Sequence, residues 1–131
     1  MSQQAVEIIL TRQLASYLAM PIFVVDPAGR LLYYNERAEA ILGHRYDETG
    51  EMPLEEWSTM WMPTAEDGSP IPLDELPLVI ALRKNQAVHR AFRIRGLDGV
   101  SRRIAVTALP LEGQGGRHLG ALAIFWEQDE A

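Results

Sequence analysis

The sequence predicts an α+β domain in which helices cover one face of a five-stranded antiparallel sheet, with an amphipathic helix in front of it. Two short apolar runs near the N-terminal end and three near the C-terminal end flank a block of helical segments. Runs of strands separated by a helical block favour an antiparallel sheet over a βαβ repeat. The length of 131 residues suits one domain.

The composition excludes several classes of protein. There is no cysteine, which excludes disulfides, thiolate nucleophiles and thiol-linked chromophores. The net charge of -6 argues against a nucleic-acid partner, which would need a positive surface. No apolar run reaches the roughly 18 residues that span a membrane, and the N-terminal stretch lacks the features of a signal peptide. We therefore expect a soluble cytoplasmic protein without membrane insertion.

The first third of the chain predicts a helix, a hairpin and a second helix. Residues 4–18 place apolar side chains at spacings of three and four, as an amphipathic helix does. Residues 22–34 predict a β-hairpin, because apolar runs flank the type I turn sequence DPAG. Asn35 suits the N-cap of the next helix. Gly43 suits a left-handed residue at the end of that helix.

The middle of the chain is harder to assign. Residues 44–72 contain four prolines, two tryptophans and three methionines, which is too apolar for a disordered linker. We expect one short helix at PLEEWSTMW, a turn at EDGSP, and packing of the whole segment against the sheet. Residues 73–85 predict a longer helix that begins near Leu73 or Asp74, with Pro77 tolerated in its first turn.

The last third predicts three antiparallel strands. Apolar and polar residues alternate with the period of two of a half-buried strand, and Gly120, Ala121 and Ala123 are small enough for another group to approach the sheet closely. The expected strands are 89–96, 102–111 and 119–127, with a turn at 97–99 and a glycine-rich loop at 112–118.

From residue 21 to residue 127 the sequence resembles the PAS superfamily. The stretch PIFVVDPAGRLLYYNERAEAILG resembles the family's strand, Asp-x-x-Gly turn, strand, Asn, helix and Gly. RRIAVTALPL and GALAIFWE resemble its closing strands, and DGSPIPLDELPLVIALRKNQAV is similar to a subgroup with a Pro-Leu-rich segment before the long helix. This division gives an N-terminal dimerisation or capping helix (1–20), a PAS domain (21–127) and a C-terminal tail (128–131). The structural signature residues are Asp26, Gly29, Asn35 and Gly43.

The resemblance implies a sensory or regulatory module for signal transduction, with a small apolar or aromatic ligand in the hollow of the sheet. The alternatives are a ligand-free protein–protein docking domain, or the input domain of a sensor histidine kinase, cyclase or transcriptional regulator. No catalytic motif is present, so we expect no enzyme. The candidate pocket residues are Val25, Leu42, Trp57, Trp61, Leu78, Leu82, Phe92, Ile94, Ile104, Val106 and Ile124.

The residues restrict the cofactor, whose identity the sequence leaves unknown. Family members with a flavin–thiol adduct or a thiol-linked chromophore need a cysteine, which is lacking here. Haem-binding relatives use a His on the long helix, and residues 73–85 contain none. His44, His89 and His118 fall in loop-like positions, so we expect them to face water, with haem ligation by His89 a remote alternative. A non-covalent small molecule, flavin included, remains open.

Two further groups of residues have competing interpretations. Trp57, Met60, Trp61 and Met62 either form a wall for a planar apolar ligand or simply cover the sheet. Arginines on two neighbouring strands either face water or bind an anion. Anion binding would require the side chain of Arg102 or Arg103 to point into the hollow of the sheet. These arginines are Arg90, Arg93, Arg95, Arg102 and Arg103.

The N-terminal helix has more apolar residues than one side of a small domain needs. We expect a homodimer in which this stripe and the small-residue strand at 120–124 form an isologous contact. A signalling effector protein or domain is a further expected partner. The candidate dimer residues are Val6, Ile9, Leu10, Leu14 and Tyr17.

Overall fold

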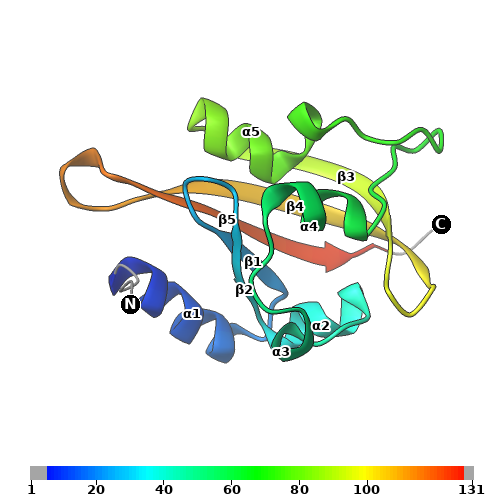
Figure 1. Ribbon diagram of the computed structural model, residues 1–131, viewed down its shortest axis with the longest axis horizontal. Coiled ribbons are helices and arrows are strands. Elements are labelled where there is room, and N and C mark those ends of the chain that lie inside the picture. Colours follow the sequence, from blue (N-terminus) through cyan, green and yellow to red (C-terminus); the bar gives the residue numbers. More distant parts are fainter. Residues whose placement is uncertain (1–5, 129–131) are drawn as a thin grey trace.

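The computed structural model of the protein describes residues 6–128. The first five residues of the expected N-terminal segment, and the expected tail beyond Gln128, lie outside the described residues. Five strands form one sheet in the order β2-β1-β5-β4-β3, in which all neighbours are antiparallel. Helices α4 and α5 lie over the same side of this sheet, whereas α1 lies apart from them (Figure 1). The predicted fold class is confirmed.

The bounds of the elements follow the chain in order. The N-terminal half contains α1 (Val6–Leu18), β1 (Ile22–Val25), β2 (Leu31–Tyr34), α2 (Glu36–Leu42), α3 (Tyr46–Thr49) and α4 (Leu54–Met60). The C-terminal half contains the 3-10 helix η1 (Leu73–Glu75), α5 (Pro77–Lys84), β3 (Val88–Arg95), β4 (Ser101–Glu112), the 3-10 helix η2 (Gln114–Gly116) and β5 (His118–Glu127). Within the described part of the chain, no helix combines the length and the apolar character needed to cross a membrane.

The hairpin turn between β1 and β2 is stabilised by Asp26. Its Oδ1 accepts hydrogen bonds from the amides of Ala28 and Arg30, both at 2.9 Å, and the amide of Gly29 donates to the Asp26 carbonyl at 2.9 Å. Gly29 has φ of +90°, a conformation that favours glycine. Asp26 and Gly29 therefore have the structural role that the sequence predicted.

Asn35 connects three parts of the fold through one buried side chain. Its Oδ1 accepts from the amide of Ala38 at 3.1 Å, which caps α2. The same oxygen accepts from the amide of Ile22, at the start of β1, at 3.1 Å. Its Nδ2 donates to the carbonyl of Met20 at 2.7 Å, so the segment that follows α1 is held by the residue that caps α2. The predicted cap is confirmed, and its contacts extend beyond the helix.

Gly43 ends α2 in the left-handed conformation, with φ of +74° and its amide bonded to the carbonyl of Glu39. A Cβ at this position would lie 2.8 Å from the backbone nitrogen of Asp98. Both the conformation and the close approach of the β3–β4 turn therefore require glycine, as the sequence predicted for the helix end.

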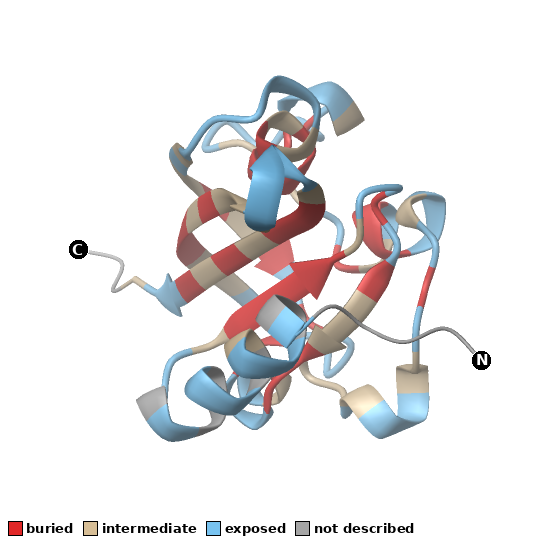
Figure 2. Ribbon diagram, turned by 90° about the vertical axis from the view of Figure 1, so that its left-hand side faces the viewer, coloured by how far each residue is buried: buried red, intermediate tan, exposed pale blue. Residues whose placement is uncertain are grey.

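The two faces of the sheet bury different sets of side chains, because successive residues of a strand point in opposite directions. On β1, Phe23 and Val25 belong to the main core beneath the helices, whereas Ile22 and Val24 belong to a second, smaller cluster. Figure 2 shows the resulting burial along the strands and the largely exposed surface of α1.

The segment between α3 and η1 is hydrogen-bonded to both edges of the sheet. At one edge, the amide of Leu31 on β2 donates to the carbonyl of Met52 at 2.8 Å. At the other edge, Thr64 and Arg93 on β3 exchange backbone bonds of 2.8 and 2.9 Å. The segment therefore crosses the sheet, and α4 lies between these two attachments. The expectation that it packs against the sheet is confirmed.

The helix expected over residues 73–85 begins later than predicted. Leu73–Glu75 form a separate 3-10 turn, Leu76 is extended with φ of -70° and ψ of 135°, and α5 starts at Pro77. A residue before proline is sterically pushed out of the helical conformation, and proline is favoured as the first helical residue. The helix α3 was not predicted at all, since it has only four residues.

We predict that Asn35→Ala lowers the free energy of unfolding by about 2–4 kcal/mol, because a helix cap is lost and buried backbone groups lose their partner. Urea denaturation followed by circular dichroism measures the change. Asn35→Ser is the matched comparison, since it keeps a side-chain oxygen suited to capping α2 and loses the donor to Met20, so it should cost less. A loss below about 1 kcal/mol for Asn35→Ala would contradict the connecting role of this side chain.

Candidate functional site

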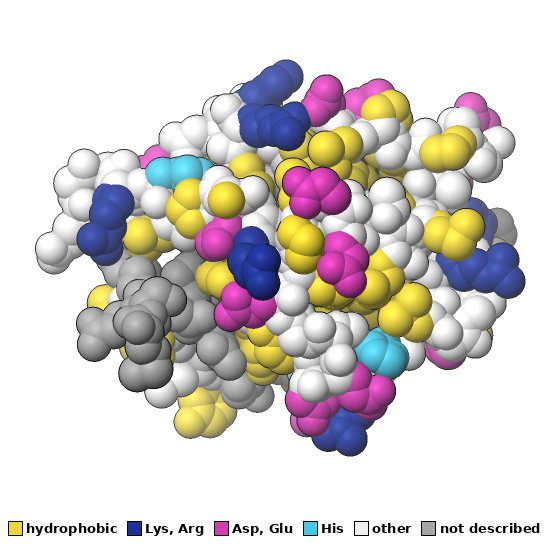
Figure 3. All heavy atoms as spheres, in the orientation of Figure 1, with side chains coloured by type: hydrophobic (Ala, Val, Ile, Leu, Met, Phe, Trp, Pro, Cys, Tyr) yellow, Lys and Arg dark blue, Asp and Glu magenta, His cyan; other side chains and the backbone are white. Residues whose placement is uncertain are grey.

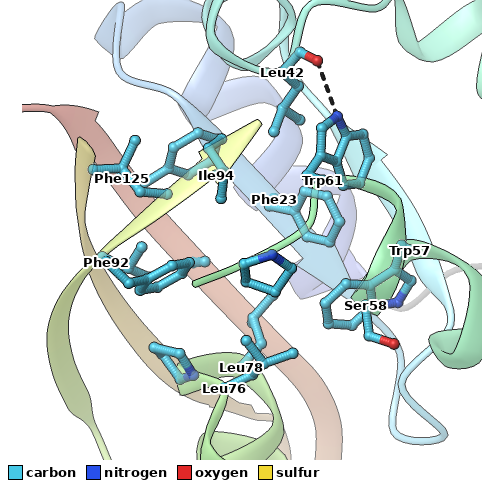
Figure 4. A pocket seen from close by; sticks show the side chains of 15 residues that line it. Phe23, Leu42, Trp57, Ser58, Trp61, Leu76, Leu78, Phe92, Ile94 and Phe125 are labelled. Carbon is cyan, nitrogen blue, oxygen red and sulfur yellow. Dashed lines mark hydrogen bonds between the residues drawn. The ribbon is translucent and has the colours of Figure 1, made fainter. Parts of the chain in front are cut away.

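A cavity of about 90 Å³ lies between the covered face of the sheet and the helices α4 and α5. Figure 4 shows its side chains converging from the strands on one side and from the helical segments on the other. The cavity is not closed on all sides. Its lining residues are Phe23, Leu42, Trp57, Ser58, Trp61, Pro63, Leu76, Pro77, Leu78, Phe92, Ile94, Ile104, Val106, Ala123 and Phe125.

Phe23 lies at the centre of the aromatic side of this cavity. Its ring centroid is 5.2 Å from that of Trp57 and 5.9 Å from that of Trp61, both in edge-to-face orientation. It also stacks on Tyr34 at 5.9 Å. Offset and edge-to-face pairs at these distances stabilise aromatic clusters. The cluster therefore gives the cavity a rigid aromatic wall that begins on β1.

Both tryptophans use their indole N–H groups within the protein. Trp57 Nε1 donates to the carbonyl of Gly29 at 2.7 Å, and Trp61 Nε1 donates to the carbonyl of Leu42 at 2.9 Å. The first bond connects α4 to the β1–β2 turn, and the second connects it to the end of α2. The rings are thereby oriented, and neither N–H is left to bind a ligand.

The structure brings most of the predicted pocket residues together. Leu42, Trp57, Trp61, Leu78, Phe92, Ile94, Ile104 and Val106 all line the cavity. Val25 and Leu82 belong to the surrounding core without lining it. Ile124 is a correction: it packs in the cluster on the opposite face, because Ala123 and Phe125 are the β5 residues that point towards the helices.

Some lining residues were missed by sequence analysis. Phe23 and Phe125 could have been found from the period-two alternation of their strands, once one residue of each strand was assigned to the covered face of the sheet. Leu76 lines the cavity because the chain is extended just before Pro77. Ser58 and Pro63 carry no pattern in the sequence that points to a cavity.

The small residues of β5 allow close packing within the domain. Gly120, Ala121 and Ala123 are all buried, and a Cβ on Gly120 would lie 2.0 Å from the carbonyl oxygen of Val25 on the neighbouring strand. The group that approaches closely is therefore the backbone of β1. The expected use of strand 120–124 in a dimer contact is wrong for these three residues, since none is accessible to a partner.

The lining does not fit a haem. It contains no His. His89 lies on β3 with its Nδ1 2.8 Å from Thr107 Oγ1, and His44 Nε2 lies 3.6 Å from a Glu48 carboxylate oxygen. His118 is half-buried at the start of β5 rather than facing water. Among the described residues, no group of three His, Asp or Glu side chains is placed to hold a metal ion.

A flavin does not fit this conformation of the cavity. Sites for ligands of drug size usually measure about 300–1,000 Å³, whereas this cavity measures about 90 Å³. A flavin ring also carries several polar atoms. The two indole N–H groups of the wall are used internally, and Ser58 is the only lining residue with a hydroxyl, carboxyl, amide or charged side chain.

The arginines of β3 and β4 lie outside the cavity, and Arg90, Arg102 and Arg103 lie close to carboxylates. Arg102 donates to Asp98 at 2.9 Å and to the carbonyl of Ile41 at 2.9 Å, and Arg103 donates to Glu66 at 2.9 Å. The hydrogen bond from Arg102 lowers the pKa of Asp98. Figure 3 shows basic and acidic side chains interspersed over the visible face, without a single basic patch. No arginine lines the cavity, so the anion-binding alternative lacks support there.

The methionines beside the tryptophans differ in their surroundings. Met60 packs against the main core without lining the cavity, and Met62 is exposed. Tyr34, on the far side of Phe23, is fully buried and donates to the carbonyl of His44 at 3.1 Å. Burial raises the pKa of Tyr34, so this hydroxyl stays neutral and acts as a structural donor. The cavity wall therefore includes the two tryptophans and neither methionine.

The predicted dimer residues lie exposed along α1. Tyr17 is 85% exposed and Leu10 is 56% exposed, and Val6, Ile9 and Leu14 are also exposed. Met20, just after the helix, continues the apolar surface. On single chains, large exposed apolar patches are often sites of interaction.

An antiparallel sheet in the order 2-1-5-4-3, with helices and an apolar cavity on one face, defines a small α+β domain built on a single covered sheet. A family model described as the PAS fold matches residues 16–130, and the chain belongs to this family. Domains of this family are generally sensory, non-catalytic modules of signal transduction. The resemblance noted in the sequence is confirmed.

Solved structures share this fold at low sequence identity. The PAS domain of the fruit-fly ELK potassium channel has a TM-score of 0.71 at 9% identity, covering 95% of this chain and 98% of that one. The PAS domain of nitrogen regulation protein NR(II) from Vibrio parahaemolyticus has a TM-score of 0.63 at 17% identity, covering 91% and 98%. A light-oxygen-voltage domain studied with a flavin analogue has a TM-score of 0.67 at 12% identity, covering 93% and 86%. No curated protein matches the chain.

We predict that Trp61→Phe lowers the free energy of unfolding by about 1–3 kcal/mol, because the bond to Leu42 and part of a buried ring are lost. Trp126→Phe is the matched control, since Trp126 is 41% exposed at the end of β5, and it should cost about 0.5 kcal/mol or less. Thermal and urea denaturation of both variants measure the difference. Equal losses would show that Trp61 does not anchor the cavity wall.

Proposed function

We propose that the protein is a cytoplasmic sensory module that binds a small, uncharged, apolar or aromatic molecule in the cavity and passes the change to α1. The observation that carries this proposal is the apolar cavity itself, walled by Phe23, Trp57 and Trp61. Small-molecule sites are typically concave and lined mainly by apolar and aromatic side chains. Apolar surface of the ligand and the wall would leave water together, which drives binding.

A short chain of contacts supports transmission from the cavity to α1. Phe23 lines the cavity, and the amide of its neighbour Ile22 donates to Asn35. Asn35 in turn holds the carbonyl of Met20, two residues after the end of α1. A ligand that displaces Phe23 would therefore act on the strand that leads back to the helix. Such a shift requires the ligand to bind one arrangement more tightly than the other.

We further propose that the protein forms a homodimer through α1. The stripe of Val6, Ile9, Leu10, Leu14 and Tyr17 contains no charged side chain and is exposed in the single chain. A two-fold symmetric contact needs a self-complementary surface, and an apolar stripe along a helix provides one when it packs on its own copy. Burying these side chains would remove an unfavourable contact with water.

The second candidate function is a docking domain that needs no ligand. The exposed stripe on α1 favours it independently of the cavity, and a small cavity is also compatible with an ordinary core. In either case the domain would act on a signalling effector, either a separate protein or a further domain. Ligand binding to the purified protein separates the two candidates.

We predict that the purified protein binds toluene and that Ala123→Leu abolishes this binding. Ala123 lines the cavity, so the larger side chain fills the space at a stability cost of about 1–3 kcal/mol. Ala91→Leu is the matched control, because Ala91 pairs with Ala105 on the face of the sheet opposite Phe92. Isothermal titration calorimetry measures both variants. Equal binding by wild type and Ala123→Leu would place the ligand elsewhere, and absence of binding by wild type would favour the docking domain.

We predict that the double substitution Leu10→Glu and Leu14→Glu converts a dimer to a monomer. Two carboxylates placed in the stripe would be buried in the interface without partners, at a prohibitive cost in desolvation. Size-exclusion chromatography with light scattering measures the mass. Met62→Glu is the control, because Met62 is exposed after α4 and should leave the dimer intact. A wild-type protein that is monomeric throughout the concentration range would refute the α1 interface.

A further inference from the structure

We propose that a cleft on the flank of the domain binds an organic cation that carries an alkylated ammonium group. The cleft lies where β2, α2 and α3 meet (Figure 1) and measures about 540 Å³. Small-molecule sites usually measure about 300–1,000 Å³. None of the residues that line this cleft also lines the apolar cavity. The cleft is therefore a second site, separate from the one proposed for the ligand of the cavity.

Three tyrosine rings form one side of the cleft, two from the end of β2 and one from the start of α3. The ring of Tyr46 lies edge-to-face against the rings of Tyr33 and Tyr34, with centroids 5.4 and 5.3 Å apart. The Tyr46 hydroxyl donates to the carbonyl of Leu32, and the Tyr34 hydroxyl donates to the carbonyl of His44. These bonds fix two of the rings and use their donors within the protein. Ring surface, which attracts organic cations through its negative face, is what remains for a ligand.

The charged side chains of the cleft leave an excess of negative charge. Three carboxylates, of Glu36, Glu39 and Asp47, line it together with one guanidinium, that of Arg45. Arg45 Nη2 lies 2.7 Å from Asp47 Oδ2, so these two charges offset each other. Glu39 Oε2 accepts from the amide of Tyr46 at 2.8 Å, and Glu36 is exposed at the first residue of α2. A helix dipole also favours carboxylates in a first turn, so they indicate a site only together with the tyrosine rings.

This arrangement favours an organic cation over a metal ion. Metal ions such as Ca²⁺ and Mg²⁺ need several oxygen ligands that converge at about 2.0–2.6 Å. Within residues 6–128, no three His, Asp or Glu side chains are placed in that way. An alkylated ammonium group spreads its charge over an apolar surface, so it can contact ring faces while separate carboxylates balance its charge. An anion would be repelled by the same carboxylates.

Choline and 3,3-dimethylbutan-1-ol test this inference, because the neutral alcohol has the shape of choline with carbon in place of the charged nitrogen. Wild type should bind choline about fivefold or more tighter than the alcohol, since ring faces and carboxylates both favour the charge. Titration of the ¹⁵N-labelled protein, followed by two-dimensional NMR at low ionic strength, measures both affinities. The amides of β2, α2 and α3 should shift on binding. Equal affinities for the two molecules would overturn the inference.

Two pairs of variants locate the site. Glu36→Gln should weaken choline binding about threefold and leave binding of the alcohol unchanged. Glu55→Gln is the matched control, because Glu55 is also exposed in the first turn of a seven-residue helix but lies outside the cleft. Tyr33→Leu should weaken choline binding about threefold, whereas Tyr33→Phe keeps the ring and should keep the affinity. Circular dichroism verifies that each variant is folded.

Equal weakening by Glu36→Gln and Glu55→Gln would show only a general attraction of cations to an acidic chain, and would overturn the cleft as a site. A choline affinity that survives both Glu36→Gln and Tyr33→Leu would overturn it as well, and so would failure of wild type to bind choline. Toluene binding in the cavity is measured separately, so each of these results leaves the proposed function standing.

Discussion

The attachment of the segment between Met52 and Thr64 to both edge strands is the constraint on which the rest of the structure depends. Edge strands present unpaired backbone groups, and here Leu31 on β2 and Arg93 on β3 bond to this segment. A chain fixed at both edges has to cross the face of the sheet between them. Helix α4 therefore lies across the sheet, and Trp57 and Trp61 become the wall of the cavity.

The cavity itself opposes stability, because its lining atoms lack packing partners on one side. The two indole hydrogen bonds act against collapse, since they fix α4 to the β1–β2 turn and to the end of α2. The carbonyl of Leu42 also accepts the amide of Leu97, and Arg102 bonds to the carbonyl of Ile41. The carbonyls of Ile41 and Leu42, which a helix end leaves unpaired, are thus satisfied by Trp61 of the wall, by Leu97 of the β3–β4 turn and by Arg102 of β4. The wall is held in place by polar bonds while its inner surface remains apolar.

The sheet and the caps could be predicted from the sequence because local rules govern them. The turn at Asp26 and Gly29, the cap at Asn35 and the alternation of β3 each follow from neighbouring residues. The course of residues 44–72 could not be predicted, because it depends on backbone bonds between residues far apart in the chain, such as Thr64 and Arg93. Ile124 was assigned to the wrong face because β5 carries apolar residues on both faces. The sequence pattern of this strand therefore does not show which residues face the helices.

Strand β1 is the element that faces both sides of the molecule. Phe23 and Val25 point into the core with the cavity, while Ile22 and Val24 point into the cluster on the opposite face. The same short strand pairs with β2 and β5 and is held by Asn35 at its first residue. Because closely packed interiors transmit displacement rather than absorb it, a shift of Phe23 would move Ile22 and the bond that holds Met20. Met20 lies two residues after the end of α1, which carries the apolar stripe. Strand β1 and the side chain of Asn35 therefore connect the cavity to the proposed dimer surface.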